Sequence, residues 1–158
     1  MASSTLRTRK LADVRFAICA SPAYLERAAT PKRIAELSEH TCLGYTLSPN
    51  VGPSRWSFGP NGEKSISVKC ALTANNGDVL REAAVAGQGI IYQPSFIVNE
   101  ELHDGRLKRL ELDYPTIEGP SLHAVYPPSD HVPLKVRAMI DYLVECYGPV
   151  PPWDRVPS

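Results

Sequence analysis

Polar side chains crowd together in residues 74–78 (ANNGD), directly before a stretch with the spacing of a helix. Asn75, Asn76 and Asp78 carry groups that can form hydrogen bonds, and Asn76 can cap the helix that follows. The first amides of a helix also favour an anion, because they point outward and lack partners within the helix. These residues therefore predict a small binding surface, although capping alone explains Asn76 about equally well.

Two elements must position these groups. Apolar residues at helical spacing follow Asn76, and Gly87 supplies the end of the helix. Residues 89–94 (GIIYQP) then form an apolar run typical of a strand buried on both faces. Gln93 and Pro94 end this strand. They can share the sheet edge where the helix starts, which is where ligands settle in α/β sheets.

The rest of the chain alternates strand and helix patterns, which predicts an α/β fold. Ser21-Pro22 is the start signal of one helix, and Thr30-Pro31 repeats it before a second. Other strands are expected at 14–20, 41–47, 106–112 and 121–128, a hairpin at 55–70, a short helix at 95–105, and the clearest helix at 130–148, with Val136, Ile140, Leu143, Val144 and Tyr147 on one face.

Catalytic and cofactor motifs have no support. The stretch GQGIIYQ lacks the third glycine of a dinucleotide fingerprint, because Tyr92 stands there, and no phosphate-binding loop or G-x-S-x-G motif occurs. The histidines show no metal-ligand spacing. Glu100-Glu101 and Glu111-Asp113 are interpreted as carboxylate pairs on polar faces. We therefore expect no enzyme activity, no cofactor and no metal.

The charge balance and the cysteines exclude further classes. Lysine plus arginine equal aspartate plus glutamate at 17 each among 158 residues, so the basic excess of a nucleic-acid-binding domain is absent. Four cysteines lie far apart without a C-x-x-C pair, and the start lacks the apolar stretch of a signal peptide. No run approaches the roughly 18 apolar residues of a membrane helix. A reduced, cytoplasmic protein without membrane contact is expected.

The order of these pieces resembles the effector-binding domain of LysR-type transcriptional regulators. The resemblance rests on LADVRFAICASPAYL, HTCLGY, GPNGE, ANNGDVLREAAVAGQGIIYQPSFIV, GRLKRL and LHAVYPPSDHVPLKVRAMIDYLVE, from about residue 4 to residue 145. It implies a periplasmic-binding-protein-like (type 2) fold, present here as a truncated subdomain with a mixed sheet flanked by helices. It also implies a homo-oligomer that contacts DNA only through an N-terminal domain missing from this chain.

The resemblance further implies a division of the chain and a ligand. Residues 1–10 would be a disordered start or a remnant of the first subdomain, and 11–112 the second effector-binding subdomain with its crossing strands. Residues 113–147 would be the strand and helix that return to the first subdomain, and 148–158 a mobile tail. A small, anionic effector would lie in a cleft between subdomains, against one wall made of Asn75, Asn76, Asp78, Gln93, Pro94 and Ser95, with Ser21, Pro22 and Tyr24 at the hinge side.

Two rivals share this fold. A solute-binding module outside transcription would carry an export signal, and none is visible. A cysteine-based redox sensor needs a pair of thiols near the cleft, and Cys70 stands alone in its segment. The effector-sensing fragment of a regulator is therefore the leading interpretation.

Overall fold

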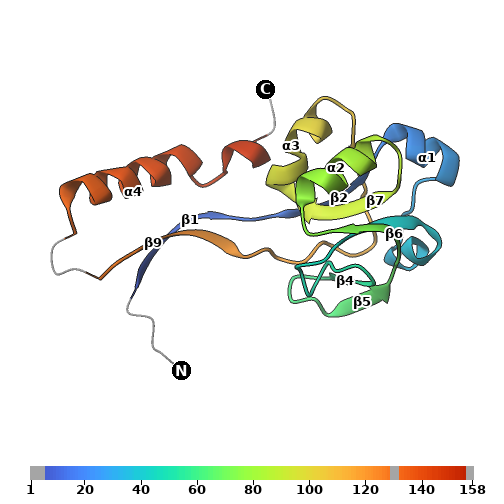
Figure 1. Ribbon diagram of the computed structural model, residues 1–158, viewed down its shortest axis with the longest axis horizontal. Coiled ribbons are helices and arrows are strands. Elements are labelled where there is room, and N and C mark those ends of the chain that lie inside the picture. Colours follow the sequence, from blue (N-terminus) through green and yellow to red (C-terminus); the bar gives the residue numbers. More distant parts are fainter. Residues whose placement is uncertain (1–5, 129–131, 156–158) are drawn as a thin grey trace. The chain divides into compact units, whose positions relative to one another are not determined.

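The computed structural model describes residues 6–128 and 132–155, which form two compact units (Figure 1). One unit is Arg15–Gly119, and the other contains the described residues before Arg15 and after Gly119. Residues 1–5 of the predicted start, residues 129–131, which include the beginning of the helix predicted at 130–148, and residues 156–158 of the predicted tail lie outside the described residues.

The larger unit is built on a five-stranded mixed sheet. Its strand order is β6-β3-β7-β2-β8. The strands β3, β6 and β7 are parallel to one another, whereas β2 runs antiparallel to both β7 and β8. The carboxyl ends of β3, β6 and β7 therefore meet at one edge of the sheet, together with the start of β2. The bounds are β2 (Phe16–Ala20), β3 (Thr41–Tyr45), β6 (Lys69–Ala74), β7 (Ile90–Pro94) and β8 (Lys108–Arg109).

Helices and a hairpin cover the two faces of this sheet. On one face, α2 (Gly77–Val85) and α3 (Ser95–His103) pack side chains such as Leu80 and Val98 against Ile91. On the other face, α1 (Pro22–Ala28), the 3-10 helix η1 (Ile34–Glu39) and the hairpin of β4 (Arg55–Phe58) and β5 (Lys64–Ser67) pack around Tyr92. Because side chains alternate along a strand, the sheet separates two apolar cores.

Tyr92 holds the second core together. Its ring packs against Phe16, Trp56 and Phe58, with ring centroids 5.4 to 5.7 Å apart. Its hydroxyl donates to the carbonyl of Ser57 at 3.1 Å and accepts from the buried amide of Ile117 at 2.8 Å. One side chain of β7 thus holds both the β4–β5 hairpin and the segment around Ile117.

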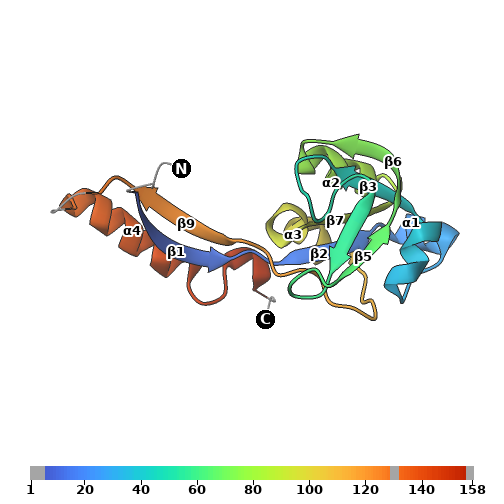
Figure 2. The same ribbon diagram turned by 90° about the horizontal axis from the view of Figure 1, so that it is seen from below.

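The smaller unit pairs β1 (Arg7–Asp13) with β9 (Ser121–Tyr126) in an antiparallel ribbon, and α4 (Leu134–Tyr147) runs along it (Figure 2). The predicted apolar face of α4 is half-buried, and no residue of this helix is fully buried. After α4, the 3-10 helix η2 (Pro152–Asp154) brings Trp153 to 5.3 Å from the ring of Tyr147. The mobility of the tail stays a prediction.

Most predicted elements are confirmed, with three exceptions. Residues 34–39 form a 3-10 helix whose N-cap is Arg33, so the predicted start at Thr30 is wrong. The amide of Ile34 instead donates to the carboxylate of Asp113 at 2.7 Å, from far along the chain. The strand expected at 106–112 is reduced to the two residues of β8. Residues 7–10, predicted as a disordered start or a remnant, lie within β1.

Candidate functional site

Two of the predicted groups meet at the sheet edge where the parallel strands end. Asn75 and Asn76 follow β6, and Ser95 follows β7. A Cβ added to Gly77 would lie 3.2 Å from Oε1 of Gln93, which places the start of α2 directly against the end of β7. The name α2 lip is used below for Asn75, Asn76, Asp78, Gln93, Pro94 and Ser95.

The start of α2 is capped, as predicted, and this changes which donors are available. Oδ1 of Asn76 accepts from the amide of Asp78 at 2.8 Å. That amide is therefore occupied, contrary to the expectation that it points outward as a free donor. Gly77 packs closely against α3: a Cβ there would lie 2.7 Å from Cδ1 of Ile97, so a larger residue would force the end of that side chain to move. Asn75 and Asn76 themselves are exposed.

The buried part of the α2 lip holds polar groups that lack partners. Gln93 is 2% exposed and Ser95 is 1% exposed. Alternation along β7 directs Gln93 to the same face as Ile91, beneath α2 and α3. Nε2 of Gln93 and Oγ of Ser95 have no hydrogen-bond partner among the described residues. Buried polar groups are normally paired, so each one left unpaired calls for a reason.

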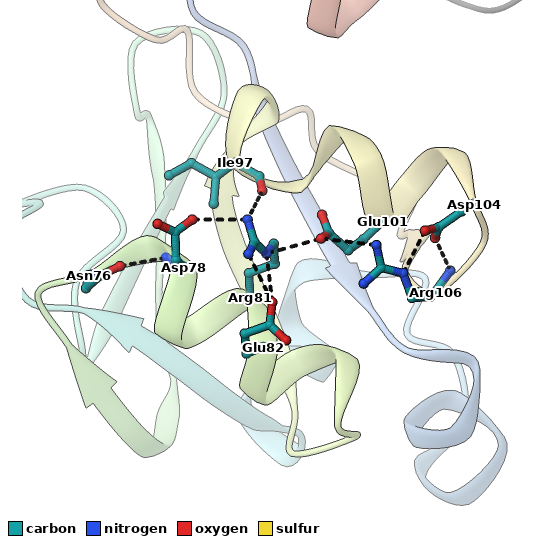
Figure 3. A network of polar contacts seen from close by, with 8 residues as sticks. All are labelled: Asn76, Asp78, Arg81, Glu82, Ile97, Glu101, Asp104 and Arg106. Atoms are coloured by element: carbon teal, nitrogen blue, oxygen red, sulfur yellow. Dashed lines mark hydrogen bonds and ion pairs between the residues drawn. The ribbon is translucent and has the colours of Figure 1, made fainter.

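Arg81, one turn into α2, connects the start of α2 to α3 (Figure 3). Its Nη1 donates to the carboxylate of Asp78 at 3.0 Å and to the carbonyl of Ile97 at 3.4 Å, and its Nη2 donates to Glu82 at 2.9 Å. Its Nε lies 3.2 Å from Oε1 of Glu101 on α3. Hydrogen bonding to Glu82 raises the pKa of Arg81, with smaller contributions from the other carboxylates.

Glu101 is the least expected member of this network. The sequence predicted it on a polar face, but it is 2% exposed, so that prediction is wrong. Its Oε1 is shared between Arg81 and Nη2 of Arg106 at 3.5 Å, and its Oε2 has no partner among the described residues. No sequence signal identifies it, because its main cation lies 20 residues away on another helix.

The third predicted group, Ser21, Pro22 and Tyr24, lies at another edge of the sheet. The antiparallel pairing of β2 with β7 sets Phe16 opposite Pro94, so the end of β2 lies at the opposite edge from the α2 lip. Ser21 caps α1 by accepting from the amide of Tyr24 at 3.3 Å, with Pro22 as the first helical residue. The structure therefore does not bring these three residues to the α2 lip.

Tyr24 has a structural set of partners at this opposite edge. Its hydroxyl accepts from the amide of Thr41 at 3.0 Å and lies 3.0 Å from Nδ1 of His40. The hydroxyl can donate to an unprotonated Nδ1 or accept from a protonated one, so the tautomer of His40 sets the direction of this bond. Burial lowers the pKa of His40 and therefore favours the neutral imidazole, opposed by the charge of Glu36.

Two thiols are closer than the sequence indicated. Cys42 on β3 and Cys70 on β6 are register partners, so Cys70 is not alone. Both thiols are free, and burial raises the pKa of Cys70 to about 11 and raises the pKa of Cys42 as well. Thiols of this kind stay protonated at neutral pH and react slowly. The pair therefore gives the redox interpretation little support.

The described residues form neither a metal-ion site nor a membrane-spanning helix. Within residues 6–128 and 132–155, no three side chains of the His, Cys, Asp or Glu type are grouped to hold a metal ion. Within the same ranges, none of the helices combines the length and apolar character needed to cross a membrane. The α2 lip with the Arg81 network is thus the polar constellation that best fits a binding role.

Comparisons with known proteins agree on one family. The model described as LysR substrate binding domain matches residues 2–147. The chain is 32% identical over 145 residues to the HTH-type transcriptional regulator CrgA of Neisseria meningitidis serogroup B, and 30% identical over 128 residues to the HTH-type transcriptional activator TtdR of Escherichia coli. These alignments cover 92% and 80% of this chain but 48% and 40% of the relatives. The chain thus spans about half the length of these relatives, or less.

Solved structures give the same result. The CrgA regulatory domain of Neisseria meningitidis matches with a TM-score of 0.74 at 33% identity, covering 94% of this chain and 72% of that one. The regulatory domain of AphB from Vibrio vulnificus matches with a TM-score of 0.72 at 27% identity, covering 91% of this chain and 70% of that one.

Proposed function

The chain belongs to the LysR substrate-binding domain family, and we propose that its α2 lip binds a small anionic metabolite on behalf of a transcriptional regulator. The mixed sheet flanked by helices is the periplasmic-binding-protein-like (type 2) fold of such regulatory domains. Binding would be signalled to a DNA-binding domain outside this chain, within a homo-oligomer that acts in the cytoplasm. The proposal assigns binding, not catalysis, to the described residues.

The observation that carries the proposal is the pair of unpartnered polar groups at the end of β7. Leaving a buried amide without a hydrogen-bond partner costs about 1–3 kcal/mol, so a purely structural role would favour an apolar side chain at position 93. Nε2 of Gln93 can donate two hydrogen bonds and Oγ of Ser95 one. A ligand with acceptor oxygens, such as a carboxylate, would satisfy these donors beside the start of α2.

The charge of Asp78 sets a condition on an anionic ligand. Asp78 is exposed and already bound to Arg81, so an anion at the α2 lip meets like charge before it meets the guanidinium. We propose that the ligand's carboxylate replaces Asp78 on Nη1 of Arg81. Because Arg81 also bonds the carbonyl of Ile97 and the carboxylate of Glu101, this exchange would change how α2 is tied to α3. Such a change could shift the population of regulator states.

The test is a thermal melt of the 158-residue chain with a panel of small mono- and dicarboxylic acids, followed by calorimetry on any acid that raises Tm. Gln93→Leu should leave the unliganded Tm unchanged or raise it, while abolishing the shift caused by the acid. Asp78→Asn should tighten binding, since it removes the competing carboxylate. A Gln93→Leu variant that binds normally would overturn the assignment.

Capping is controlled by a matched pair of variants. Asn76→Ala and Ser21→Ala each remove an N-cap hydrogen bond and should cost a similar ~1 kcal/mol of stability. Only Asn76→Ala should also weaken binding, because Ser21 lies at the opposite edge of the sheet. Equal losses of binding in the two variants would mean that stability alone controls the response.

A further inference from the structure

The smaller unit holds a cavity of about 480 Å³ between its ribbon and its long helix. Alternate residues of β1 share a face, so Arg7 and Arg9 both face this cavity, and Tyr126 lies opposite Arg7 in the register. Arg137 and Asp141 line it from α4, one turn apart, and Ile140 adds apolar surface. Every one of these residues belongs to the smaller unit.

The three arginines of this cavity are exposed and form no ion pair among the described residues. No ion pair or side-chain hydrogen bond joins Arg7, Arg9 or Arg137 to another residue within the described ranges. Lys10, their neighbour on β1, is instead paired with Asp13 at 2.7 Å. Asp141 is the one carboxylate among the described residues of the cavity wall, so the described lining carries three positive charges against one negative charge. In a chain with no net charge, this is a local excess.

We propose that this cavity is a second ligand site, distinct from the α2 lip, which takes a small dianion of the dicarboxylate or phosphate class. The planar guanidinium presents its donors as a fork that matches carboxylate and phosphate oxygens. Two excess positive charges match one dianion, and the hydroxyl of Tyr126 can add a hydrogen bond. The volume lies within the range of about 300–1,000 Å³ that small-molecule sites occupy.

The experiment titrates the 158-residue chain, at low ionic strength, with succinate and separately with inorganic phosphate. Binding is measured by calorimetry and located by backbone amide chemical shifts. Arg9→Gln and Arg137→Gln should each weaken binding about tenfold or more, as expected for a lost charge-assisted hydrogen bond. Asp141→Asn should tighten it. Lys135→Gln is the matched control, because it removes a positive charge from the same helix outside the cavity lining.

The outcomes separate the ligand sources and the two sites. Tighter binding of succinate identifies a carboxylate ligand, and tighter binding of phosphate identifies a phosphate ligand. The shifts should map to β1 and α4 and should persist in Gln93→Leu, so failure at the α2 lip leaves this site standing. The proposal is overturned if neither probe gives a saturable titration, or if Lys135→Gln weakens binding as much as Arg137→Gln does.

Discussion

Replacing Arg81 with methionine should destabilise the larger unit by about 2–4 kcal/mol, because it strands a buried carboxylate. Removing one partner of a buried ion pair costs roughly 3–5 kcal/mol. The value here is reduced because Arg106 remains 3.5 Å from Oε1 of Glu101, whose side chain is 3% exposed. The pairs of Arg81 with Asp78 and Glu82 contribute little, since those carboxylates are 67% and 63% exposed.

A double-mutant cycle isolates the buried charge. Glu101→Gln keeps the shape and an acceptor oxygen but removes the charge, so it should cost only about 1 kcal/mol. In the double variant the stranded charge no longer exists, and the combined loss should fall short of the sum by roughly 1–3 kcal/mol. Arg33→Met is the control, because Arg33 makes a 2.8 Å pair with Glu36 in which both side chains are exposed. It should change stability far less.

Urea unfolding followed by tryptophan fluorescence can measure this cycle in the larger unit alone. The chain has two tryptophans, of which Trp56 is fully buried in the larger unit and Trp153 lies in the smaller one. A Trp153→Phe background therefore leaves Trp56 as the reporter. Additive losses from Arg81→Met and Glu101→Gln, or a loss in Arg33→Met as large as in Arg81→Met, would refute the claim that the buried charge is what matters.

Two further predictions concern hydrogen bonds of tyrosine hydroxyls. Tyr92→Phe should lower the free energy of unfolding by about 2–3 kcal/mol, because it leaves the buried amide of Ile117 without an acceptor. Urea unfolding measures this loss, with Tyr45→Phe as the control. Equal losses in the two variants would contradict the prediction. Burial lowers the pKa of His40 in the folded state. The stability that the neutral His40 side chain contributes is therefore complete above the unfolded pKa of roughly 6.5, and it is lost as the pH falls through the lower folded pKa. Melts between pH 7 and pH 5 should therefore show a decline that His40→Gln makes shallower, since burial in the folded state disfavours the charged imidazole. Identical slopes would contradict this.

The fold was predictable from the sequence where local patterns decide it. The cap at Asn76, the buried run of β7 and the amphipathic α4 each carry their signal within a few residues, and each is confirmed. The start of η1 was not predictable in the same way. Its first amide is bound by Asp113, and no local pattern records a partner from that far along the chain.

The candidate site was only partly predictable, for a reason of topology. Strand ends follow from sequence, but which ends share an edge depends on strand direction. Parallel β6 and β7 bring Asn76 and Gln93 together, whereas antiparallel β2 carries Ser21 to the other edge. The residue pattern alone indicated Asn76 and Gln93, whereas the resemblance to a family added Ser21, and the pairing of strands separates Ser21 from the other two.

Burial provides the strongest distinction between binding and packing at the α2 lip. Ser21 is 2% exposed, and its hydroxyl accepts a hydrogen bond that caps a helix, so the fold explains its presence. Gln93 is equally buried, but its amide nitrogen forms no hydrogen bond with any of the described residues. A leucine of similar size there would avoid the cost of an unpaired donor. In the proposed function, this donor meets an acceptor that arrives with the ligand. For this reason Gln93, and not the cap Asn76, is the residue on which the proposed function depends.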